Sequence, residues 1–275
     1  MRRPPAVQGR FYPGTREKTY KLISDLEANS RFVVPKNIKG KIIGSILPHA
    51  GILYSGTQTI PYFKVLNQTS SFPDTFIILN PNHSGTGPDI ALEEGVSWYN
   101  DAGEVEIDLE LNKLLPFSHD ASAQRREHSA EVLLPYIQYF ADGRPFKILP
   151  ICLKNIMPER ATELAGAIKN AVETTGRNVQ VIASSDFSHF LTPDAGRKSD
   201  DLVLEEIKNK DISKLENVVL KNGLTICGYC PIMVLMSYAA LVDAEYKTTI
   251  LARGNSGEVI PSHDVVDYIS ILFHA

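Results

Sequence analysis

Four polar side chains with metal-binding or acid–base chemistry lie just beyond apolar runs of the sequence. His49 follows one such run, His83 follows the next, and Asp186 and His189 follow a third. In open α/β sheets, ligands bind in the crevice outside the carboxyl ends of the strands. The placement of these residues therefore predicts a metal or catalytic site.

Neutral imidazole is a common metal ligand, and two histidines on neighbouring loops can converge without strain. A single loop histidine more often satisfies backbone carbonyls, but the pair His49 and His83 together with Asp186 and His189 favours a functional site. Asp186 is a candidate ligand or orienting carboxylate, with a turn or helix cap as the alternative. His189 is a candidate ligand or general acid–base.

Cys227 precedes a predicted helix, whose dipole would lower the pKa of the thiol and favour the thiolate. With Cys230 it could form half of a zinc site or a redox pair, although there is no second cysteine pair. The competing interpretation is a small buried residue at a helix start. Cys152 lies within an apolar run and is interpreted as inert core.

His128 and Glu127 lie where a helical pattern is predicted to begin. Capping and the helix dipole would explain Glu127 alone. His128 is a candidate proton donor into a nearby crevice, with a purely structural role as the alternative.

Composition excludes several classes of protein. The chain has 275 residues, a net charge of −4 and no basic stripe, so we expect no nucleic-acid partner. Three cysteines are too few for a disulfide framework and favour a reducing compartment. No apolar run approaches the ~20 residues that a membrane helix needs, so we expect a cytoplasmic protein without a membrane partner.

Apolar strands alternate with helical patterns along the chain, which predicts a single α/β domain over residues 1–275 with a twisted, mostly buried sheet and helices on both faces. Predicted strands span residues 41–47, 75–80, 89–92, 146–152, 179–183, 246–252 and 266–273. Predicted helices span residues 15–29, 57–67, 127–143, 158–175, 194–208, 211–221 and 231–242. Residues 103–118 fit neither pattern well.

Several of these segments resemble motifs of the Memo family, in the same order along the chain. The matching motifs are RPPAV at 3–7, LPHAG at 47–51, NPNH at 80–83, EHSAE at 127–131, SSDFSH at 184–189 and ICG at 226–228. The resemblance implies a fold akin to class III extradiol dioxygenases.

It also implies a metal site at His49, His83 and Cys227, lined by Asp186 and His189. Members of the family are described as iron or copper binders, as redox proteins and, in animals, as phosphotyrosine-peptide adaptors. The microbial form, AmmeMemoRadiSam system protein B, implies a functional link to AMMECR-type and radical-SAM proteins.

The first hypothesis is a metal-dependent redox enzyme of the dioxygenase-like type. Iron(II) or copper suits two imidazoles and a thiolate, and zinc is also possible. His189, His128 and Asp186 would then supply acid–base catalysis. Extradiol enzymes use a carboxylate as third ligand, so the choice between Cys227 and Asp186 stays open, and ring cleavage is in doubt.

The second hypothesis is a non-enzymatic binding module that captures a peptide or small anion in the same crevice. A phosphotyrosine reader would need clustered arginines, which the sequence supports only weakly. A third is a remodelled dioxygenase fold without activity. The substrate stays unknown.

Overall fold

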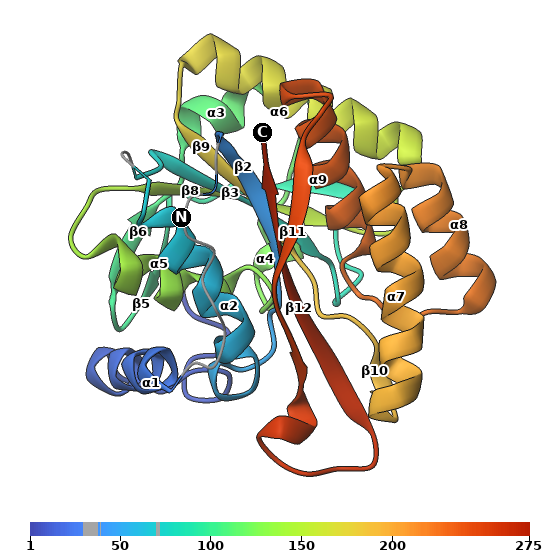
Figure 1. Cartoon of the computed structure of the whole chain (residues 1–275). Coiled ribbons are helices and arrows are strands. Elements are labelled where there is room, and N and C mark those ends of the chain that lie inside the picture. Colours follow the sequence, from blue (N-terminus) through green and yellow to red (C-terminus); the bar gives the residue numbers. More distant parts are fainter. Residues whose placement is uncertain (30–37, 39, 70–71) are drawn as a thin grey trace.

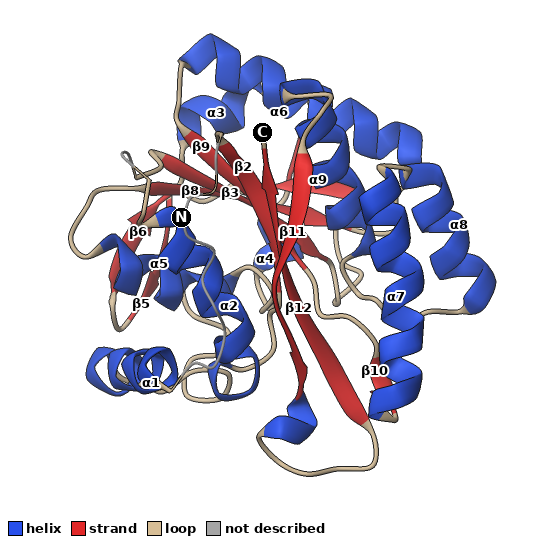
Figure 2. Cartoon of the chain, in the orientation of Figure 1, coloured by secondary structure: helices blue, strands red, loops and turns tan. Residues whose placement is uncertain are grey.

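The computed structural model describes residues 1–29, 38, 40–69 and 72–275. Its centre is a large mixed β-sheet with helices on both faces, as Figures 1 and 2 show. The α/β prediction is therefore confirmed. The buried strands form a rigid base for the loops that carry the predicted site residues.

The nine-stranded sheet runs in the order β10-β12-β2-β9-β3-β8-β4-β7, and β11 pairs with β12. Its strands are β2 (Ile42–Leu47), β3 (Thr75–Pro81), β4 (Ile90–Leu92), β7 (Ser118–His119), β8 (Lys147–Leu153), β9 (Val179–Ser184), β10 (His189–Leu191), β11 (Lys247–Asn255) and β12 (Val265–His274). Strands β2, β9, β3 and β8 are parallel neighbours. Their carboxyl ends therefore meet at one edge of the sheet.

A second, three-stranded sheet has the order β1-β5-β6 and lies beside the main one. Its strands are β1 (Arg2–Arg3), β5 (Ser97–Asn100) and β6 (Gly103–Glu106). Sequence reasoning missed it because strands of two to four residues are too short to show an alternating pattern.

Helices cover both faces of the large sheet (Figure 1). On one side are α1 (Arg16–Ala28), α2 (Ile52–Leu66) and α5 (Leu134–Ala141). On the other are α6 (Pro158–Thr175), α8 (Ile212–Asn222) and α9 (Tyr229–Val242), while α7 (Pro193–Asn209) packs against β10, β11 and β12. Short segments are α3 (Leu109–Leu114), α4 (Ala121–Gln124) and the 3₁₀ turns η1 (Glu131–Leu133) and η2 (Ser256–Glu258). Among the described residues, no helix combines the length and apolar character needed to cross a bilayer.

Most long elements match the predictions to within a few residues, and three boundaries are wrong. Helix α2 begins at Ile52 rather than at residue 57, because Gly56 lies inside the helix and not in a turn. The N-cap of α7 is Thr192, whose side chain accepts from Ala195 N, and not Asp194. The helical pattern that starts at Glu127 is irregular until η1 and α5.

Candidate metal centre

The candidate centre lies at the carboxyl ends of three adjacent parallel strands. Leu47 of β2 is in register with Ser184 of β9, and Leu79 of β3 is in register with Ala183 of β9. The loops that follow these strands carry His49, His83 and Asp186. The structure therefore places these side chains together, with 5.4 Å between the imidazole centroids of His49 and His83.

Three side chains offer ligand atoms that converge on one point. One atom each from His49, His83 and Cys227 lie within 4.8 Å of one another, which is the spacing a single metal ion could bridge. The set combines two imidazoles and a sulfur, the three residues that the family resemblance implies.

His49 is fully buried and has a defined tautomer. Its Nδ1 lies 2.8 Å from Ser184 Oγ, and this hydroxyl donates to Ser129 O at 2.7 Å. Because the single hydroxyl proton is used there, Ser184 Oγ must accept from Nδ1–H of His49. Nε2 of His49 therefore keeps its lone pair and lies 3.3 Å from Cys227 Sγ.

The environment also keeps His49 neutral. Burial lowers its pKa well below the usual value, and repulsion between a protonated His49 and the nearby imidazoles of His128 and His83 lowers it further. A neutral imidazole with an available Nε2 is the form that binds a metal.

His83 is oriented by Glu127, which accepts from His83 Nδ1 at 2.9 Å and from His83 N at 2.7 Å. A carboxylate can only accept, so Nδ1 carries the proton and Nε2 is available. Burial alone would lower the pKa of His83, but the hydrogen bond and charge of Glu127 outweigh it, and the net pKa is raised.

Glu127 is the functional residue whose role sequence reasoning missed. It is not a helix cap: besides His83 it accepts from His128 N, Ser129 N and Ser129 Oγ, all through Oε1. Burial would raise its pKa, but the hydrogen bond from His83 and the charges of His83 and His128 hold the pKa well below its usual range. The only hint of this role in the sequence was the position of the acidic Glu127 before a segment with a weak helical pattern.

Cys227 reaches the centre from the loop that precedes α9. Gly228, the N-cap of this helix, approaches β9 so closely that a Cβ there would lie 2.3 Å from Ser185 Cβ and 2.4 Å from Ser184 O. This contact brings Cys227 to His49, and the thiol also lies 3.6 Å from Asp186 O.

The predicted lowering of the Cys227 pKa is wrong for the metal-free protein. Burial raises the pKa of the thiol, and the charge of Asp186 raises it further. Desolvation and a neighbouring carboxylate outweigh the helix dipole here.

The other cysteines take no part in the centre. Cys230 is buried, and its Sγ lies 3.4 Å from Ile156 N and 3.7 Å from Ile156 O. Cys152 is buried in β8 beside Asn80. Among the described residues, the possible metal-ligand groups include Cys227 but neither Cys230 nor Cys152.

The imidazole ring of His128 lies next to the rings of both ligand histidines. Its ring stacks on His83 with 4.7 Å between centroids and lies 5.4 Å from the ring of His49. Burial lowers the pKa of His128, although the nearby charge of Glu127 partly opposes this.

Asp186 is buried against the backbone of the His49 loop. Its Oδ1 accepts from His49 N at 2.8 Å and from Ala50 N at 3.3 Å, while Oδ2 lies 4.0 Å from His49 Nε2. Burial raises its pKa to about 6, although the backbone hydrogen bond from His49 opposes the shift.

His189 lies at the rim, half-buried, at the start of β10. Its Nδ1 donates to Thr225 O at 2.7 Å, and its backbone N donates to Thr225 Oγ1 at 2.8 Å. Nε2 of His189 is therefore the basic nitrogen.

A second possible ligand group shares His83 and consists of His83, Glu127 and His128. The Oε1 atom of Glu127 already accepts from His83, His128 and Ser129, and its Oε2 accepts from His83 N. Coordination by Glu127 would break these bonds, which favours the group that contains Cys227.

Comparison with known proteins gives a consistent result. A family model described as Memo-like protein matches residues 3–272. A MEMO1 family protein of Methanobrevibacter smithii is 37% identical, with 99% of this chain and 100% of the relative covered. A MEMO1 family protein of Methanococcoides burtonii is 35% identical, with 98% and 99% covered.

A solved structure has a similar fold. The crystal structure of an uncharacterized protein from Escherichia coli K12 superposes with a TM-score of 0.52 at 12% identity, covering 84% of this chain and 99% of that one. At this identity the similarity concerns the fold alone.

Proposed function

This chain belongs to the Memo family, and from that premise we propose that it is a metal-dependent redox protein. His49, His83 and Cys227 would hold iron or copper, with zinc as a further candidate. The observation that carries this proposal is the convergence of three ligand atoms within 4.8 Å.

The donor set fits such an ion. Both imidazoles keep Nε2 available because Ser184 and Glu127 accept from their Nδ1–H groups, the arrangement common around metal-binding histidines. The Cys227 thiol faces the Nε2 lone pair of His49 at 3.3 Å. Metal binding would release the thiol proton and replace this contact with a metal–thiolate bond.

When bound, the metal would supply electron transfer and polarise a coordinated substrate. Asp186, with a pKa of about 6, would exchange protons near neutral pH. His189, held by Thr225, would present Nε2 as a base at the rim. His128 would stay neutral beside His83 and accept a proton as charge develops.

We further propose that the fold is related to class III extradiol dioxygenases, with a thiolate in place of the carboxylate ligand. Asp186 is the carboxylate that the sequence offered as an alternative ligand, but its Oδ1 is engaged by two backbone N–H groups. This difference argues for redox chemistry other than ring cleavage.

Metal analysis of variants tests the ligand assignment. Protein loaded anaerobically with Fe(II) or Cu should retain near-stoichiometric metal after desalting, and His49→Ala should lose it. His263→Ala is the matched control, because His263 is exposed and contacts only Asp264 among its described polar neighbours. Equal retention by His49→Ala, or no retention by the parent protein, would refute the assignment.

The same preparation separates this proposal from a binding module for a peptide or small anion. Binding of a phosphotyrosine peptide would be measured with loaded and metal-stripped protein. Affinity that is unaffected by stripping would favour the module, whereas affinity that depends on the metal would favour metal chemistry.

A further inference from the structure

Arg3 is a buried cation close to the candidate metal centre that the proposed function does not use. It lies on β1 and is only 7% exposed. Its guanidinium lies over the ring of Trp98, with 4.1 Å from Cζ to the ring centroid. Removing an arginine from water is costly, so the acceptors that compensate for this cost show what the side chain holds.

The nitrogens of the guanidinium donate to three different acceptors. Nη1 donates to Glu131 Oε2 at 2.8 Å, Nε to Gln124 O at 2.8 Å and Nη2 to Glu127 O at 2.6 Å. Two of these acceptors are backbone carbonyls of the segment that ends at Glu127, the residue that accepts from His83 Nδ1. A planar guanidinium fixes the directions of such bonds together, which a lysine ammonium cannot do.

Glu131 holds the arginine in place. Its side chain is 2% exposed and accepts from Arg3 Nη1, from Tyr12 Oη at 2.9 Å and from two backbone N–H groups, those of Ala6 and Val7. These donors come from separate positions of the segment that begins with Arg3. The orientation of the guanidinium is therefore set by several hydrogen bonds to one buried carboxylate.

The same segment contacts the centre a second time through Phe11. The ring of Phe11 lies against that of His128, with 4.8 Å between the centroids. The carbonyl of Phe11 accepts from Ile52 N at 2.8 Å, at the start of α2, which follows the His49 loop. The segment therefore contacts the loops of both histidines.

We propose that Arg3 is a positioning residue of the metal centre, which sets the orientation of His83 through Glu127. Its bond to Glu127 O fixes the main chain that carries the carboxylate, and this carboxylate accepts from His83 Nδ1 and His83 N. The inference rests on the proposed function, since it concerns the same ligand histidine. Without the guanidinium, the Glu127 carboxylate would no longer be held against the imidazole.

The first test is Arg3→Ala with and without methylguanidinium. A hollow of about 190 Å³, which Arg3 lines, lies beside the space that the substitution would vacate, so a small cation can enter it. We expect Arg3→Ala to bind cobalt(II) about tenfold more weakly than the parent protein, measured by competition with a chelator. Methylguanidinium should restore the affinity.

A second measurement needs no metal. In ¹H–¹⁵N spectra of the imidazole groups of the metal-free protein, the Nδ1–H proton of His83 should give a sharp signal while Glu127 accepts it. Its absence in His83→Gln would assign it. We expect Arg3→Ala to lose this signal and methylguanidinium to restore it. If the parent protein binds no metal, the ligand assignment fails, whereas this signal still decides the role of Arg3.

Arg3→Lys separates the geometry of the guanidinium from its charge. Lysine keeps a positive charge beside Glu131 but cannot donate to the carbonyls of Gln124 and Glu127 in the same fixed directions. It should therefore lose the His83 signal as Arg3→Ala does, while its midpoint of urea denaturation falls less. This variant also decides the question where Arg3→Ala does not fold.

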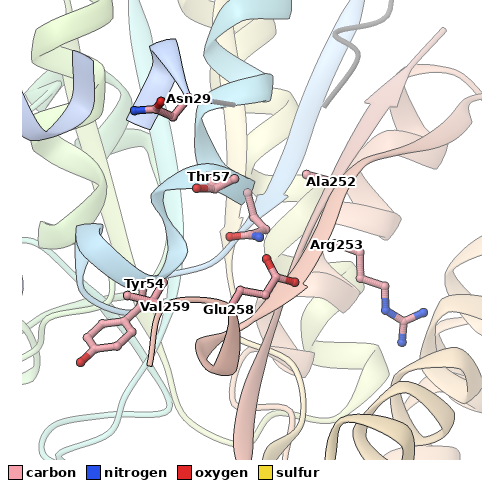
Figure 3. A pocket seen from close by; sticks show the side chains of 8 residues that line it. Asn29, Tyr54, Thr57, Ala252, Arg253, Glu258 and Val259 are labelled. Carbon is pink, nitrogen blue, oxygen red and sulfur yellow. The ribbon is translucent and has the colours of Figure 1, made fainter. Parts of the chain in front are cut away.

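Arg253→Ala is the matched control, because Arg253 also donates to a carboxylate, that of Asp201, and to a backbone carbonyl, Arg197 O. Figure 3 shows Arg253 at the hollow between α2 and the β11–η2 segment, with its side chain directed away from Glu258. This variant should keep the imidazole signal and the cobalt affinity.

Three results would each overturn the proposal. One is that Arg3→Ala or Arg3→Lys keeps both the signal and the affinity of the parent. Another is that Arg253→Ala loses them to the same extent, which would show a general effect of stability. The third is that methylguanidinium leaves a folded Arg3→Ala unchanged.

Discussion

The histidines of the candidate centre share one feature: a fixed acceptor holds the Nδ1 proton of each. Ser184 does this for His49, Glu127 for His83 and the Thr225 carbonyl for His189. Each imidazole therefore presents Nε2. The acceptors come from the end of β9 and from two separate loops, so orienting the ligands requires the whole edge of the sheet and not only the two histidines.

Glu127→Gln tests this orienting role. Gln keeps the size of the side chain but loses the charge, and its NH₂ group would oppose one of the donors at His83 N or Nδ1. We expect metal affinity to fall about 10–100-fold, measured by competition with a chelator.

The control for this variant is Glu94→Gln, at an exposed position. Denaturation of the metal-free proteins would show how much of the effect is a loss of stability. Unchanged metal affinity in Glu127→Gln would mean that Glu127 does not orient His83.

Sequence reasoning could find His49 and His83 because each follows a recognisable buried strand. It could not assign Glu127, since the bond to His83 joins positions 44 residues apart. Nor could it find that burial raises the pKa of Cys227, because the helix start was visible but the enclosing side chains were not.

At the scale of elements, the approach of α9 to β9 decides whether Cys227 reaches the histidines. Gly228 N donates to Ser185 Oγ at 3.1 Å, and a side chain at residue 228 would collide with the β9 backbone. The position of the thiol thus depends on a glycine at the start of the helix.

Gly228→Ala should displace the start of α9 and pull Cys227 away from His49. We expect a loss of about 1–3 kcal/mol in the free energy of unfolding, measured by urea denaturation. We also expect loss of the thiolate-to-metal absorption band of the cobalt-substituted protein.

Gly166→Ala on α6 is the matched control, because a Cβ at this position would have no packing contact within 4 Å. It should stabilise the protein by about 0.5–1 kcal/mol and leave the band intact. If Gly228→Ala keeps both stability and band, the close approach is not needed.

The long elements were predictable because each carries a full helical or strand period. The start of α2 was not predictable, because glycine is typical of turns, whereas Gly56 lies inside the helix at a tight packing contact. A Cβ there would lie 2.6 Å from Leu26 Cδ1 and 2.9 Å from Tyr136 Oη, on α1 and α5. Only the arrangement of three helices explains this glycine.

At the scale of the molecule, a buried polar cluster joins α7 to the edge of the sheet. Asp200 accepts from Ser188 N at 3.0 Å, and Asp267 of β12 accepts from Ser188 Oγ at 3.0 Å. Arg253 of β11 contacts both Asp200 and the exposed Asp201. The cluster therefore links four segments and fixes the residue before His189.

Burial, and then the hydrogen bond and charge of Asp267, raise the pKa of Asp200 to about 7, well above the ~3.9 of an unfolded chain. Between about pH 4 and pH 7, Asp200 therefore binds a proton in the folded protein but not in the unfolded chain. The stabilisation is therefore complete below about pH 4 and is lost as the pH rises through about 7, with a slope of up to ~1.4 kcal/mol per pH unit.

Asp200→Asn should remove the contribution of Asp200 to the pH dependence of the free energy of unfolding, because an amide resembles the protonated acid at every pH. Urea denaturation at a series of pH values from about 5 to 8 would give the free energy of unfolding of parent and variant. Asp201→Asn, which removes only the exposed partner of Arg253, should keep the slope of the parent. Asp186 also titrates in this range, but it does so equally in all three proteins, so it cancels in the comparison.

A slope in Asp200→Asn as steep as that of the parent would mean that Asp200 is already ionised in the folded protein, and that Arg253 rather than a shared proton holds α7 against the sheet.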